Sequence, residues 1–177
     1  MAKFINHVHE MKDSPLDYEL YVQAYHEGVL GQKIADHFNR SIEEVLELAR
    51  DPSHGGKTTV SSFIEAMVGF ELERDGVLGI SFKRGVIETN LIDGWERMWD
   101  VTAPPSLKNV DFNVEVKQAV ESILRKFSKF PEGNIGILLC CSFLKKEDLM
   151  LLETKLQPAL TENQRFLVRL VHIDGVL

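Results

Sequence analysis

The chain lacks a long hydrophobic run. No apolar stretch approaches the roughly 18 residues that a membrane-spanning helix requires, and the first ten residues, MAKFINHVHE, contain no apolar signal-peptide core. We therefore expect a soluble, cytoplasmic protein with no membrane partner.

Cysteine is scarce, because the chain has only two, the neighbours Cys140 and Cys141 in a continuous apolar segment. Adjacent residues of a strand point to opposite faces of the sheet, so the two thiols are poorly placed to bridge. No CxxC motif or nearby histidine completes a zinc-binding set. We expect both thiols to be reduced and buried, as in most intracellular proteins.

Positive charge is the minority charge, with 20 Lys and Arg against 27 Asp and Glu and a net charge of −7. A protein that coats nucleic acid without specificity releases counterions through a broad field of basic side chains, so this composition excludes that class. What remains is typical of one globular domain, with 44% apolar and 27% charged residues in 177 positions.

The first part of the chain is predicted to be helical. A helix is expected to begin at Ser14-Pro15, and residues 30–50 have the pattern of two short helices around Asn39-Arg40-Ser41, which resembles a helix-turn-helix. Glu43, Glu44 and Glu47 lie on the second of these helices and would repel DNA phosphates. The loop at residues 51–57 marks a boundary, so we expect an N-terminal helical segment at 1–52 and an α/β domain at 53–177.

The second part alternates between helical and strand patterns. A helix is predicted at 59–74, followed by two short strands joined by a turn at residues 83–85. Residues 95–103 suit either a helical turn capped by Asp93 or a strand, and their β-propensity favours the strand. Further strands are predicted at 110–117, 134–143 and 165–173, with helices at 118–130 and 146–156. This order predicts an α/β fold with a mixed β-sheet flanked by helices.

Residues 110–117, VDFNVEVK, contain the sharpest local pattern. Apolar and polar residues alternate strictly, as in a strand with one buried face, and Glu115 and Lys117 then share the polar face. The same residues also suit the first turn of a helix that begins at Asn113 with Glu115 near its N-terminus.

If residues 110–117 form a strand, the chain resembles the core of the PD-(D/E)xK nuclease superfamily over roughly residues 59–143. The matching residues are Glu115 and Lys117 in EVK, Asp100 in MWDV and the helix acid Glu65 in FIEAM. Asp93 or Asp111 could replace Asp100 as the second acid, and Trp99 stands where the family often has a proline.

The resemblance implies a Mg²⁺-dependent domain that hydrolyses DNA phosphodiester bonds. Asp100, Glu115 and Glu65 would be the metal ligands, and Lys117 would act with Asp100 and Glu115 in catalysis, beside a metal-bound water. A basic rim could contact DNA: Lys83, Arg84, Lys108, Arg125, Lys126 and Lys129. The alternative is a non-catalytic acidic interaction protein, an immunity or accessory factor that docks a protein partner.

Overall fold

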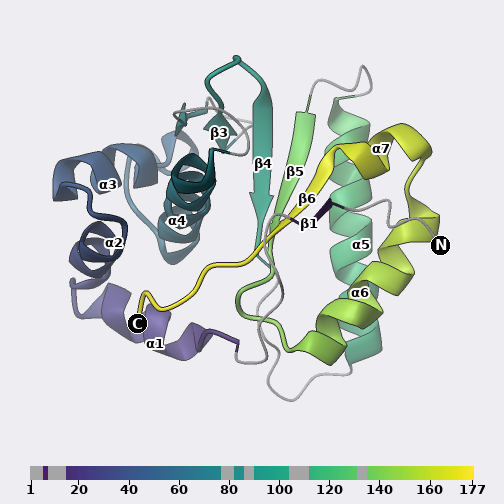
Figure 1. Ribbon diagram of the computed structural model, residues 1–177, viewed down its shortest axis with the longest axis horizontal. Coiled ribbons are helices and arrows are strands. Elements are labelled where there is room, and N and C mark those ends of the chain that lie inside the picture. Colours follow the sequence, from purple (N-terminus) through teal and green to yellow (C-terminus); the bar gives the residue numbers. More distant parts are fainter. Residues whose placement is uncertain (1–5, 8–14, 77–81, 86–89, 104–111, 131–134) are drawn as a thin grey trace.

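The computed structural model describes residues 6–7, 15–76, 82–85, 90–103, 112–130 and 135–177. These residues form a mixed six-stranded sheet with α-helices on both faces (Figure 1). The predicted α/β class is therefore confirmed.

The sheet has the strand order β1-β6-β5-β4-β3-β2. The strands are β1 (Asn6–His7), β2 (Lys83–Arg84), β3 (Leu91–Ile92), β4 (Met98–Thr102), β5 (Ile135–Cys140) and β6 (Val168–Val171). Strands β2, β3 and β4 form an antiparallel meander, whereas β4, β5, β6 and β1 run parallel. Every residue of β5 is buried, because helices cover both of its faces, and this explains its continuous apolar sequence.

Two helical layers enclose the sheet. One face carries α4 (Val60–Asp75) together with α1 (Tyr18–His26), α2 (Leu30–Phe38) and α3 (Ile42–Ala49), and the other carries α5 (Phe112–Lys129), α6 (Lys146–Ala159) and α7 (Glu162–Phe166) (Figure 1). Each layer has its own hydrophobic core. Cys140 lies in the first core and Cys141 in the second, and both thiols are free and buried, as predicted.

The N-terminal helices follow from their capping residues. Asn39 ends α2 in the left-handed conformation, and Ser41 opens α3 with a capping box in which its side chain and that of Glu44 bond each other's backbone N–H. The two predicted short helices are therefore confirmed. The first helix begins later than predicted, at Tyr18 behind the cap residue Asp17, and not at Ser14-Pro15.

The predicted strand at 110–117 is wrong. Residues 112–129 form the single helix α5, while residues 110 and 111 lie outside the described part of the chain. The turn predicted at residues 83–85 is also wrong at its first two positions, because Lys83 and Arg84 form strand β2. The strand expected within 95–103 is present as β4.

In the part of the chain that the structure describes, no helix is both long and apolar enough to cross a membrane.

Candidate functional site

Strand β4 carries Asp100 into the interface with α5. The Asp100 side chain is 14% exposed, and the Lys126 ammonium group of α5 lies 3.0 Å from its Oδ1. Lys126 also donates a hydrogen bond of 2.6 Å to Thr102 Oγ1, one position along the same face of β4. Burial raises the pKa of Asp100, and the positive charges of Lys126 and Lys129 offset this only in part.

On the other face of the sheet, helix α4 presents Glu65 to the guanidinium of Arg84 from β2. Arg84 lies 3.6 Å from Asp51 as well, so one buried arginine serves two carboxylates. Asp51 belongs to the loop that the sequence marks as a boundary, and this loop is closed by a bridge between Asp51 and Lys57. The boundary loop therefore contributes directly to this group of charges.

The two carboxylates beside Arg84 have opposite pKa shifts. Burial raises the pKa of Glu65 more than Arg84 lowers it, and the negative charges of Asp51 and Asp100 raise it further. Burial also acts to raise the pKa of Asp51, but hydrogen bonds from Ser53 and His54, together with Arg84, lower it to about 2. We call Asp51, Glu65, Arg84, Asp100 and Lys126 the charged cluster.

The structure brings two of the predicted metal ligands, Glu65 and Asp100, within electrostatic reach of each other. They nevertheless approach from different faces of β4. Trp99 and Val101, the neighbours of Asp100, pack into the core on the α4 face, so the alternation of the strand directs Asp100 toward α5. Each carboxylate consequently has its own cation.

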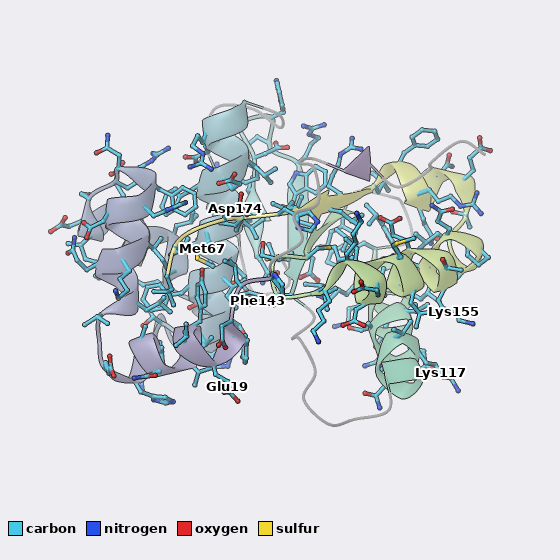
Figure 2. The ribbon with its side chains drawn as sticks, turned by 60° about the horizontal axis from the view of Figure 1, so that its bottom comes forward. Glu19, Met67, Lys117, Phe143, Lys155 and Asp174 are labelled. Carbon is cyan, nitrogen blue, oxygen red and sulfur yellow. The ribbon has the colours of Figure 1, made fainter. Side chains whose placement is uncertain are left out.

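Lys117 does not join the charged cluster. It is exposed on α5, and nine residues at about 100° each place it on the opposite side of this helix from Lys126. Figure 2 shows Lys117 at the periphery of the molecule. Glu115 lies eleven residues before Lys126, which corresponds to about 16 Å along the helix axis. Glu115 and Lys117 are therefore not part of a strand, and a metal-binding role of Glu115 stays a prediction.

Asp93, the alternative second acid, closes the turn between β3 and β4. Its buried carboxylate accepts hydrogen bonds from the backbone N–H groups of Trp95 and Arg97, from Arg97 Nε at 2.8 Å and from Trp99 Nε1 at 2.9 Å. Burial opposes ionisation of Asp93, but these donors outweigh it and lower the pKa. The acceptor sites of Asp93 are thus occupied by the turn itself.

As they are paired, these residues do not fit Mg²⁺. This ion takes oxygen ligands from one or two carboxylates and keeps several waters, whereas Glu65 and Asp100 each face a cationic side chain. Among the described residues, no three His, Cys, Asp or Glu side chains are grouped as a metal site.

Arg84 and Lys126 were predicted only as members of a general basic rim. Their partners depend on contacts across the sheet, which local patterns do not contain. A signal for Lys126 did exist, because it lies three residues after Ile123 and seven after Ala119, at the edge of the buried face of α5, where an ammonium group needs a partner.

Comparison with protein-family models gives no match, and neither a curated protein nor a solved structure matches the chain.

Proposed function

We propose that the chain is a non-catalytic binding protein, whose charged cluster holds the sheet and helices together. One observation carries this proposal: the buried carboxylates that would have to hold a metal are already neutralised by the protein's own cations. Arg84 pairs with Glu65 and Asp51, and Lys126 pairs with Asp100.

The energetics of buried ion pairs support the proposal. Removing one partner from such a pair typically costs about 3–5 kcal/mol, because the other charge is left buried and alone. A divalent ion at Glu65 would have to displace Arg84, whose side chain is only 9% exposed. In this proposal the function lies in a surface that docks a partner, as expected for an acidic accessory or immunity factor.

A second candidate function is Mg²⁺-dependent hydrolysis of DNA, and the positions of two predicted acids favour it. The order α4, β2, β3, β4, α5, β5 has a helix acid, Glu65, and a strand acid, Asp100, beside an ammonium group. In this candidate, Glu65 and Asp100 would hold the metal only without the pairing of Arg84 with Glu65, and Lys126 would take the role predicted for Lys117. Burial raises the pKa of both Glu65 and Asp100, and such perturbed acids are frequent at functional sites.

Thermal unfolding with and without Mg²⁺ or Mn²⁺ separates the two candidates. A ligand that binds the folded state raises the melting temperature. We expect no metal-dependent shift in the unmutated protein or in Asp100→Asn, and no cleavage of single- or double-stranded DNA. Glu121→Gln, an exposed carboxylate of α5, serves as the matched control.

The opposite result would establish the nuclease candidate. It consists of a metal-dependent rise in melting temperature and cleavage of DNA, both lost in Asp100→Asn and retained in Glu121→Gln.

A further inference from the structure

A cavity of about 490 Å³ opens where strands β4, β5 and β6 begin. Its lining includes Arg97, Trp99, Gly136, Phe166 and Arg169, and Phe166 is 56% exposed. The turn before β4 and the junction of α7 with β6 lie at this end of the sheet (Figure 1). The charged cluster contributes none of the lining residues.

Arg97 is held rigidly on one side of this cavity. Its Nε donates to the buried Asp93 carboxylate at 2.8 Å, and its guanidinium lies 4.8 Å from the centre of the Trp95 ring and 5.8 Å from that of Trp99. A guanidinium fixed by one carboxylate and two rings retains further N–H donors. About half of the Arg97 side chain is exposed, so these donors are accessible.

Arg169 brings a second guanidinium to the same cavity from β6. The described residues offer Arg169 no carboxylate partner. Burial lowers the pKa of Arg169, and the positive charge of Arg97 lowers it further. Two arginines thus line the cavity, and only Arg97 has a carboxylate partner, Asp93. The cavity is also lined by Glu96, whose carboxylate lies 3.0 Å from the ammonium group of Lys83. An anion placed between them would satisfy the unused donors and remove the repulsion.

We propose that this cavity binds a nucleotide, with its phosphate between Arg97 and Arg169 and its base stacked on Phe166. The exposed Trp95 ring, 62% accessible, offers a second stacking surface beside Arg97. The volume lies in the range of small-ligand sites, and a phosphate dianion matches two guanidinium groups. The net charge of −7 favours a compact anion over a long polyanion.

The nucleotide proposal names a ligand class for the proposed binding function, and it rests on that function. The charged cluster is absent from the cavity lining, so the two proposals are tested at different residues. If metal causes no shift and nucleotides do not bind, the ligand class is wrong and the binding role stands. If metal shifts the melting temperature through Asp100, the proposed function is wrong.

Intrinsic fluorescence can test the proposal, because the chain has two tryptophans, Trp95 and Trp99. Arg97 stacks on both rings. Titration with AMP, excited at the red edge of tryptophan absorption and checked by calorimetry, should give saturable binding. AMP should bind more tightly than adenosine or inorganic phosphate, since only AMP supplies both the anion and the base.

Arg169→Gln should weaken AMP binding by about tenfold or more, as expected for the loss of a charge-assisted pair of hydrogen bonds. Its melting temperature should be unchanged or higher, because the repulsion of Arg97 is removed, and this shows that lost binding is not lost folding. Arg125→Gln, an exposed arginine of α5 outside the cavity, is the matched control and should bind AMP as the unmutated protein does.

A phosphorylated strand end carries the same chemistry as a free nucleotide. A 5′-phosphorylated oligonucleotide that binds more tightly than AMP, with loss on dephosphorylation, assigns the site to strand ends, whereas tighter AMP binding assigns it to free nucleotides. The proposal is overturned if neither ligand binds at millimolar concentration or if Arg169→Gln binds equally well. It is also overturned if an acidic peptide competes better than AMP, which would make a protein the partner.

Discussion

At the scale of single residues, Arg84 is the most consequential cation in the described part of the chain, because it neutralises Glu65 and Asp51 together. We expect Arg84→Met to lower the free energy of unfolding by about 3–5 kcal/mol near neutral pH, as is typical when a buried charge loses its partner. Urea unfolding measures this loss. The double variant Arg84→Met/Glu65→Met should recover most of it, and the exposed Arg125→Met should change stability by less than about 0.5 kcal/mol.

The loss caused by Arg84→Met should shrink as the pH falls from 7 toward about 5. The folded-state pKa of Glu65 lies above its unfolded value, so the folded protein takes up the proton first and stability rises as the pH falls through the folded pKa. Without Arg84 this pKa should rise further. An equal loss at both pH values would contradict the burial of an unpaired Glu65. Asp51 acts in the opposite sense: its stabilisation is lost only as the pH falls from about 4 toward 2.

At the scale of elements, α5 demonstrates the limit of local patterns. The alternation at 110–117 has the period of a strand, yet Val116 lies on the same buried helical stripe as Ile123 and Phe127. The position beside β4 is taken by β5, which pairs with it over five residues. The local pattern could not decide between strand and helix here, because the outcome depends on pairing between residues far apart in the sequence. The alternative prediction, a helix starting near Asn113, is the correct one.

Elements with strong local signals were predictable. Thr59 caps α4 and Gly76 ends it in the left-handed conformation, and the expected helix at 59–74 differs from the observed one by a single residue at each end. Asp100 was expected on a strand and lies on β4. Its partner Lys126 could not be assigned, because that contact joins residues 26 positions apart and depends on how α5 packs.

The capping box of α3 permits a direct test at this scale. Ser41→Ala removes the acceptor for the Glu44 backbone N–H, which lies 3.1 Å from Ser41 Oγ. We expect a loss of about 1 kcal/mol in the free energy of unfolding, measured by urea denaturation. Ser128→Ala, an exposed serine near the end of α5, is the control. A change no larger than that of the control would mean that the cap contributes nothing to stability.

At the scale of the whole molecule, the N-terminal helices share one hydrophobic core with the sheet. Tyr21 of α1 packs edge-on against Phe143, which follows β5, with ring centres 5.0 Å apart, and Phe143 is fully buried. Figure 2 shows Phe143 between the two helical layers. Aromatic contacts thus link the predicted helical segment at 1–52 to the predicted α/β domain at 53–177.

We therefore expect a single cooperative unfolding transition, the same by tryptophan fluorescence and by far-UV circular dichroism. Phe143→Ala should lower the free energy of unfolding by about 3–5 kcal/mol through the cavity that it leaves. The exposed Phe166→Ala is the control. Two separated transitions in the unmutated protein would show instead that the N-terminal helices unfold independently.

Gly136 on β5 leaves the space that the Trp99 side chain of the neighbouring strand β4 occupies. A methyl group at this position would overlap the six-membered part of the Trp99 indole, which lies across the β5 backbone. That indole also anchors Asp93, and Arg97 rests against its face. The absence of a Cβ atom at Gly136 therefore allows the Trp99 indole to lie flat on β5. The position of this indole in turn fixes the β3–β4 hairpin and the orientation of the Arg97 guanidinium.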